Sequence, residues 1–183
     1  MTDPFGSLLL VLARSAIGEH FGLPGARVSD DPRLGEKGAA FVTLTLDGEL
    51  RGCIGTIEAH RSLGEDVRKN AAAAALRDPR FSPLTAEEFA RVKIEVSVLS
   101  AVEAMPHRTE EDILAQLRPG KDGVVIRYQG RQATYLPQVW RHFADPKKFL
   151  AELKRKAWLD AEFWSPDMEV GRYTLLKWSE EEP

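Results

Sequence analysis

Apolar residues recur at helical spacing in several stretches of the chain. Residues 6–21 place leucine, alanine and isoleucine three and four positions apart, which predicts an amphipathic opening helix. Ser62 and Glu65 have the spacing of a capping box, and the helix that they open runs through five alanines and stops before Pro79. Because alanine has little bulk, we expect this helix to pack closely against a sheet. Further helices are predicted over 85–92, 109–117 and 146–157.

Other stretches alternate apolar and polar residues, as half-buried strands do. Residues 40–57 alternate on both sides of Asp47-Gly48, a dipeptide that favours a two-residue hairpin turn because both central positions need positive φ. Residues 92–100 alternate too, with valine and isoleucine on one face and Glu95 on the polar face. Further strands are predicted over 123–137, turning near Gln129-Gly130, and over 169–178, and a loop is predicted from Gly22 to about Gly38.

The order of these elements indicates the fold class. Strands occur as hairpins and singles between helices without a repeating βαβ unit, so we predict an α+β fold with a mostly antiparallel sheet flanked by helices. A chain of 183 residues can bury a substantial core. We find no internal repeat and no linker long enough to separate independent domains, so residues 1–183 are expected to form one folding unit.

Composition narrows the functional classes. The chain is 43% hydrophobic and 29% charged, with a formal net charge of -3, which makes nucleic acid an unexpected partner. The basic run over 147–156 is interpreted as a solvated helix face. Arg14 and Glu19 interrupt the apolar opening stretch, which is therefore neither a signal peptide nor a membrane span. One cysteine cannot form an internal disulfide and gives no metal-ligand spacing, so we expect a cytoplasmic protein without cofactor or metal.

The single cysteine, Cys53, lies in the segment "LRGCIG" over 50–55. In an extended strand Arg51 and Cys53 share a face, and a guanidinium beside a thiol favours the nucleophilic thiolate. Gly52 and Gly55 lack Cβ atoms and could let a ligand or another backbone approach closely. The alternative is that Cys53 is a small buried hydrophobe, as free cysteines often are.

Four further residues are candidates for a site. Asp78 and Arg80, in "RDPRF", could brace a rigid turn as a bidentate pair, or Arg80 could hold an anion in a cleft. Glu95 could serve as a general acid or base, or as a solvated ion-pair partner of Lys93 or an arginine. Gln138, after the strand-ending Pro137, could point its amide toward the group that Cys53 faces.

Several common signatures are missing from the sequence. It contains no P-loop, dinucleotide fingerprint, zinc signature or serine nucleophile elbow. The four histidines are scattered, so sequence order reveals no cysteine–histidine pair.

Together the segments "FVTL", "LRGCIG", "AAAAALRDPRF", "IEVSVLS", "ATYLPQVW" and "LAELKRKAWL" resemble the AMMECR family, and within it the bacterial branch, the A component of the AmmeMemoRadiSam system. The resemblance covers residues 8–178. It implies an α+β fold with a larger and a smaller lobe and a cleft near "LRGCIG". It also implies partners, a Memo-like protein and a radical-SAM protein, but no established activity. The family positions carried over are Leu50, Arg51, Gly52, Cys53, Ile54, Gly55, Asp78, Arg80, Phe81, Pro137 and Gln138.

The sequence departs from the family pattern at one helix end. Bacterial relatives tend to read "KRKAGL", whereas this chain has Trp158 in place of the glycine, so that a residue with easy left-handed geometry is replaced by a bulky ring. Glu95 is typical of the bacterial form and not of the animal branch.

Two functional hypotheses follow. In the first, the protein is an enzyme or enzyme subunit that uses Cys53 and Glu95 chemically, while Arg51 and Arg80 supply positive charge for an anionic substrate. In the second, it is a non-catalytic module whose glycine-flanked strand binds a protein partner. RNA binding is a third possibility, which the acidic balance disfavours.

Overall fold

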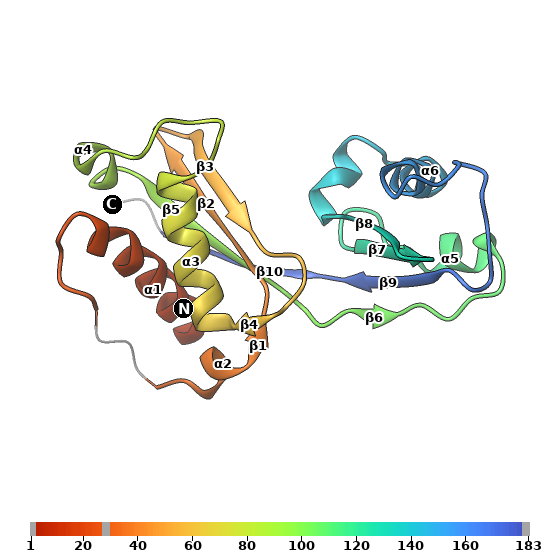
Figure 1. Cartoon of the computed structure of the whole chain (residues 1–183), viewed down its shortest axis with the longest axis horizontal. Coiled ribbons are helices and arrows are strands. Elements are labelled where there is room, and N and C mark those ends of the chain that lie inside the picture. The colour runs from red at the N-terminus through yellow and green to blue at the C-terminus, as the bar shows by residue number, and fades with distance from the viewer. Residues whose placement is uncertain (1–2, 27–29, 181–183) are drawn as a thin grey trace. The chain divides into compact units, whose positions relative to one another are not determined.

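The computed structural model describes residues 3–26 and 30–180 of the chain (Figure 1). It divides into two compact units, which are described separately. Unit 1 comprises Met1–Leu99 and Leu176–Pro183, and unit 2 comprises Ser100–Leu175. The predicted α+β class with mostly antiparallel sheets is confirmed in both. The predicted loop from Gly22 to Gly38 contains a short helix and strand, and its residues 27–29 lie outside the described part.

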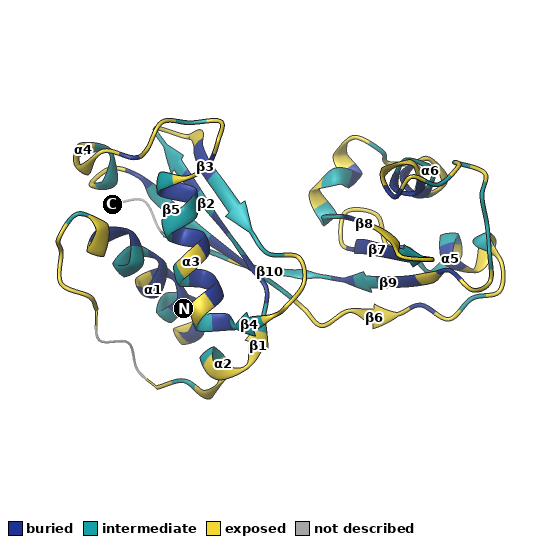
Figure 2. Cartoon of the chain, in the orientation of Figure 1, coloured by how far each residue is buried: buried dark blue, intermediate teal, exposed yellow. Residues whose placement is uncertain are grey.

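Unit 1 combines a four-stranded sheet, in the order β10-β5-β2-β3, with two main helices. Helices α1 and α3 pack on one face of the sheet and on each other, and their sheet-facing residues are buried (Figures 1 and 2). The elements are α1 (Pro4–His20), α2 (Pro32–Gly35), β1 (Lys37–Gly38), β2 (Ala40–Leu46), β3 (Glu49–Gly55), β4 (Arg61–Ser62), α3 (Leu63–Leu76), α4 (Ala86–Phe89), β5 (Lys93–Leu99) and β10 (Leu175–Ser179).

Unit 2 has its own four-stranded sheet, in the order β6-β9-β7-β8, and its own core. In that core the rings of Trp140 and Phe149 stack with centroids 3.8 Å apart. Its elements are β6 (Glu103–Ala104), α5 (Glu110–Gln116), β7 (Gly123–Tyr128), β8 (Arg131–Tyr135), the 3₁₀-helix η1 (Pro137–Arg141), α6 (Pro146–Lys156) and β9 (Glu169–Tyr173).

Both predicted hairpin turns are confirmed. Asp47 and Gly48 have φ values of 53° and 84°, and Gln129 and Gly130 have 46° and 78°. Positive φ at both central residues gives these turns the twist that matches the flanking strands. The dipeptides Asp47-Gly48 and Gln129-Gly130 therefore form the turns of the β2–β3 and β7–β8 hairpins, as the sequence predicts.

The capping predictions were partly wrong. Ser62 accepts a hydrogen bond from the backbone N–H of Glu65, but the Glu65 carboxylate pairs with Lys69 instead of returning to the cap. Complete capping boxes occur at α4, from Thr85, and at α5, from Thr109.

The final predicted strand, 169–178, is two strands. β9 ends at Tyr173 and belongs to the sheet of unit 2, whereas β10 begins at Leu175 and belongs to the sheet of unit 1. Alternation alone could not locate this break, because both halves have strand-like sequences.

No helix in the described residues is long and apolar enough to cross a membrane.

The alanine-rich helix α3 packs on β3 at very short range, as predicted. A Cβ added to Gly52 would lie 2.2 Å from the backbone oxygen of Ala74. Real Cβ atoms do not approach an oxygen so closely, so only glycine allows this helix–strand distance. Gly52 thus sets the depth at which α3 lies on the sheet.

We predict that Gly52→Ala lowers the free energy of unfolding by about 1–3 kcal/mol, because α3 must move away from β3. Urea unfolding followed by circular dichroism measures the change. The matched control is Gly35→Ala, because a Cβ there meets no atom within 4 Å. Equal stability of Gly52→Ala and wild type would contradict the proposed role of this contact.

Candidate functional site

Cys53 lies on the face of the unit 1 sheet opposite to α1 and α3. Its neighbour Gly52 faces α3, and successive strand residues point to opposite faces. Thr43 on β2 is the register partner of Cys53, and Glu95 on β5 is the register partner of Thr43. The three side chains therefore form one row across the sheet. Within it the Thr43 hydroxyl donates to the Cys53 sulfur at 3.3 Å, and Cys53 is half-buried.

Glu95 is the centre of a polar cluster at the other end of this row. Its carboxylate accepts from Lys177 Nζ at 3.3 Å and from Ser179 Oγ at 3.2 Å, both on β10. Ser97 Oγ lies 3.5 Å away. Two strand spacings separate Glu95 from Cys53, about 10 Å, so the carboxylate is too far to take the thiol proton directly.

Arg51 is the extra residue of a β-bulge in β3. The β2–β3 register shifts between Leu44 and Thr45, which interrupts the alternation expected to place Arg51 beside Cys53. The Arg51 Nε and Nη2 groups each donate to the Glu88 carboxylate at 2.9 Å, and the side chain is 11% exposed. Arg51 Nη1 is buried and has no hydrogen-bond partner among the described residues. The Arg51 guanidinium is therefore held by its ion pair with Glu88 of α4.

The ion pair with Arg51, and then the capping contacts with Thr85, lower the pKa of Glu88 to about 2 against the opposing effect of burial. Glu88 thus joins the bulge to the start of α4 as an ionised group. Nothing in the sequence pointed to this pairing, because α4 and β3 are distant in the chain.

Asp78 and Arg80 form the bidentate pair that was one of the two sequence interpretations. Arg80 Nε and Nη2 donate to the two carboxylate oxygens of Asp78 at 3.0 and 2.7 Å. The pair also covers the outer edge of β3: the Cys53 N–H donates to Asp78 Oδ2 at 2.8 Å, and Arg80 Nη2 donates to the Cys53 carbonyl at 3.4 Å. Two side chains thus replace a neighbouring strand at Cys53.

Charge is unevenly exposed within this pair. Arg80, and then the Cys53 backbone N–H, hold the pKa of Asp78 well below its usual range although burial opposes this. Asp78 raises the pKa of Arg80 against the opposing effect of burial. The Asp78 side chain is 2% exposed and that of Arg80 is 53% exposed. Arg80 therefore presents positive charge near Cys53, whereas Arg51 does not.

The space beside both glycines of the motif is filled by the chain itself. α3 occupies the space beside Gly52, and a Cβ on Gly55 would lie 2.2 Å from the ring of Phe41. Packing within unit 1 accounts for both residues, and the substrate-binding role expected of them remains a prediction.

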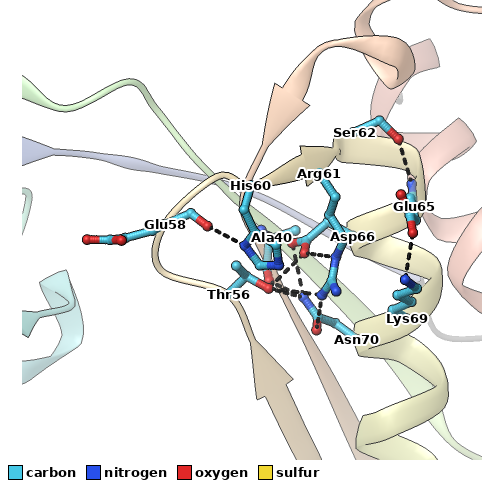
Figure 3. Close-up of polar contacts among 10 residues, drawn as sticks. All are labelled: Ala40, Thr56, Glu58, His60, Arg61, Ser62, Glu65, Asp66, Lys69 and Asn70. Atoms are coloured by element: carbon cyan, nitrogen blue, oxygen red, sulfur yellow. Dashed lines mark hydrogen bonds and ion pairs between the residues drawn. The ribbon is translucent and has the colours of Figure 1, made fainter.

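A second polar network holds the chain just after β3 (Figure 3). Fully buried Asp66, on α3, accepts from the Ala40 N–H at 2.8 Å, from the Thr56 hydroxyl at 2.7 Å and from Arg61 Nε at 2.7 Å. Asn70, one turn further along α3, donates to the Ala40 carbonyl at 2.9 Å. Because the side chains of Asp66 and Asn70 have hydrogen-bond partners, we interpret this network as a structural connection between α3 and the sheet.

The remaining candidates lie elsewhere. Gln138 is exposed in η1 of unit 2, and its expected orientation toward Cys53 remains a prediction. In the described ranges no histidine hydrogen-bonds to Cys53 or Glu95; His60, for example, contacts the carbonyl of Glu58 (Figure 3). Residues 3–26 and 30–180 contain no cluster of three potential metal ligands.

The sequence analysis missed Thr43, Lys177 and Ser179. A two-residue turn at Asp47-Gly48 without a bulge would pair Thr43 with Gly52, and only the bulge brings it opposite Cys53. Lys177 and Ser179 reach the site because β10 is separate from β9 and belongs to the sheet of unit 1. The sequence carries no signal for this break.

The site is thus a thiol, a hydroxyl and a carboxylate in one row on an α+β sheet. Comparison with known proteins identifies the family. The sequence model of the AMMECR1 family matches residues 10–178, and the chain belongs to this family.

The relatives include archaeal proteins. Protein SSO0193 of Saccharolobus solfataricus is 35% identical over all of this chain and 85% of its own length. Protein MK0488 of Methanopyrus kandleri is 36% identical over 97% of this chain and 89% of its own length. The crystal structure of uncharacterized protein PH0010 from Pyrococcus horikoshii is similar with a TM-score of 0.79 at 34% identity, covering 100% of this chain and 95% of that one. None of these names states an activity.

We predict an acid-sensitive contribution from Glu88. Because folding lowers its pKa, the ionised group stabilises the fold above the pKa of an unfolded carboxylate, about 4.3, and this stability is lost as the pH falls toward 2. Glu88→Gln should lower stability at pH 7 by about 1–3 kcal/mol and flatten the decline below pH 5 or so.

Urea unfolding midpoints measured across the acid range test this, with Glu87→Gln on the same helix as the control. A Glu88→Gln profile parallel to that of wild type would mean that the Arg51–Glu88 pair does not contribute as described.

Proposed function

We propose that this AMMECR1-family protein is a thiol-dependent enzyme, or the thiol-bearing subunit of one, with Cys53 as nucleophile. One observation carries the proposal: the fold uses Arg51, the two glycines and the Cys53 backbone, whereas it makes one side-chain hydrogen bond to the sulfur. Arg51 binds Glu88, the space beside Gly52 and Gly55 is filled by the chain, and the Cys53 backbone is held by Asp78 and Arg80. The half-buried sulfur lies beside a hydroxyl, on the face of the sheet opposite to α1 and α3.

The surrounding groups support distinct roles. The Thr43 hydroxyl donates to the sulfur and so stabilises a thiolate, after the thiol has lost its proton to water. The thiolate would then add to an electrophilic carbonyl carbon of the substrate, and the electron pair of the broken C=O π bond would move to the carbonyl oxygen. Half-exposed Arg80 supplies positive charge for an anionic group, a role that buried Arg51 supports only by holding the bulge. Glu95, with Lys177, would bind a polar part of the substrate about 10 Å away.

The pathway assignment is part of the proposal. The resemblance to the A component of the AmmeMemoRadiSam system supports joint action with a Memo-like and a radical-SAM protein in the cytoplasm. Membership of the AMMECR1 family is the finding on which this extension rests.

A non-catalytic binding module is the second candidate. It is favoured by the neutralisation of Arg51 and Arg80, since carboxylates of the chain already pair with both arginines. In that case the polar row around Thr43 and Glu95 would bind a protein partner, and the sulfur would contribute only contact area.

Alkylation tests the activated thiol. Because Cys53 is the only cysteine, iodoacetamide incorporation reports on it alone. We expect iodoacetamide to alkylate Cys53 at neutral pH faster than it alkylates free cysteine, because the thiolate is the nucleophilic form. Thr43→Val should slow the reaction by removing the hydroxyl, and Thr43→Ser should restore the rate. A wild-type rate at or below that of free cysteine would refute the thiolate mechanism.

Complementation separates the enzyme from the binding module. In a strain lacking the gene, Cys53→Ser should fail to restore pathway function, although the purified variant still captures the Memo-like and radical-SAM proteins as wild type does. Full complementation by Cys53→Ser would refute the thiol chemistry and favour the binding module. Loss of capture on Glu95→Gln with Lys177→Gln would assign the polar row to partner binding.

A further inference from the structure

Trp158 combines two unfavourable features. Its side chain is the most exposed large hydrophobic group described, at 85%. Its backbone has a φ of 61°, a left-handed conformation that bulky residues rarely adopt. In the free protein the residue therefore carries backbone strain without the burial that usually stabilises an indole ring.

The strain follows from the way in which α6 ends. The Leu159 N–H donates to the Lys154 carbonyl at 3.0 Å, and the Trp158 N–H donates to the Arg155 carbonyl at 2.9 Å. These two bonds form a Schellman motif, whose left-handed position is normally glycine. Glycine at position 158 would make the same bonds without strain, so helix termination does not explain the tryptophan.

One cation contacts the Trp158 backbone, and two basic residues stand just before Trp158 in the last turn of α6. Arg131 Nη1 donates to the Trp158 carbonyl at 2.6 Å, and Arg131 is exposed with no carboxylate partner among the described residues. Arg155 and Lys156 are exposed in the last turn of α6. Arg155 is partly neutralised by Glu152, whereas Lys156 donates to the carbonyl of Thr134.

We propose that Trp158, Arg131, Arg155 and Lys156, the Trp158 patch, dock an acidic segment of a partner protein. Tryptophan and arginine are the residues that dominate binding energy at protein interfaces, and strain in a free protein is often offset in a functional contact. The partner would bury the indole in an apolar hollow flanked by Asp or Glu side chains. Charge complementarity favours acidic groups.

A protein partner fits this patch better than nucleic acid. The chain carries 28 acidic against 25 basic residues, and the Trp158 patch itself contains three basic residues. Nucleic-acid binding would need a wider basic surface to follow a phosphate backbone. This inference is independent of the thiol chemistry at Cys53.

A stability measurement separates docking from a structural role. Trp158→Gly should fold normally and raise Tm by a few degrees, about 2–4 °C, because it relieves the left-handed strain. A lowered Tm would show that the ring stabilises the free protein, and would overturn the proposal.

Selection from a displayed random-peptide library tests the ligand class. Panning on the immobilised full-length protein, with counter-selection on Trp158→Gly, should enrich peptides with two or more acidic residues beside an apolar one. The best synthetic peptide should lose at least about 30-fold in affinity on Trp158→Gly and part of it on Trp158→Phe, the loss expected of an interface hot spot. Arg155→Gln should mainly weaken the salt dependence of binding.

The matched control is Leu23→Ala, which removes another exposed apolar side chain, on unit 1, and should leave affinity unchanged. Failure to enrich any peptide, or equal affinity for wild type and Trp158→Gly, would overturn the proposal. So would Trp158-dependent binding of a single-stranded RNA 12-mer in a gel-shift assay without peptide binding, which would assign the patch to nucleic acid.

Discussion

The close contact between α3 and β3 is the constraint on which unit 1 depends. At Gly52 the helix backbone lies where any side chain would be, so the helix must cover this face of the sheet. Strand alternation then directs Cys53 to the opposite face. The same contact that buries the alanine-rich helix therefore places the half-buried sulfur on the other face of the sheet.

Electrostatic pairing gives the motif a rigid frame. Arg51 and Glu88 join the bulge of β3 to α4, while Asp78 and Arg80 bind the backbone of Cys53 along the open edge. The Asp78–Arg80 pair thus holds the Cys53 backbone through its N–H and its carbonyl. Only Arg80 keeps enough exposure to act on a ligand, which limits the positive charge available for any reaction at the sulfur.

Local signals in the sequence predicted much of the fold. The dipeptide Asp47-Gly48 requires positive φ and so located its hairpin, and alternation around Glu95 located β5 and its polar face. Both signals act over a few residues, as turn and strand preferences do. The candidate site was predicted in part: Cys53, Glu95 and the Asp78–Arg80 pair lie in unit 1, but their spatial partners were missed.

The sequence by itself determined the main helices and hairpins, the α+β class, the family and the thiol. The tertiary structure decided which groups meet, because contacts such as Lys177 with Glu95 join strands far apart in the chain. It also decided that the β3 bulge places Thr43 opposite Cys53, since one extra residue changes every pairing beyond it. Sequence patterns record neighbours along the chain, whereas the chemistry of this site depends on neighbours across the sheet.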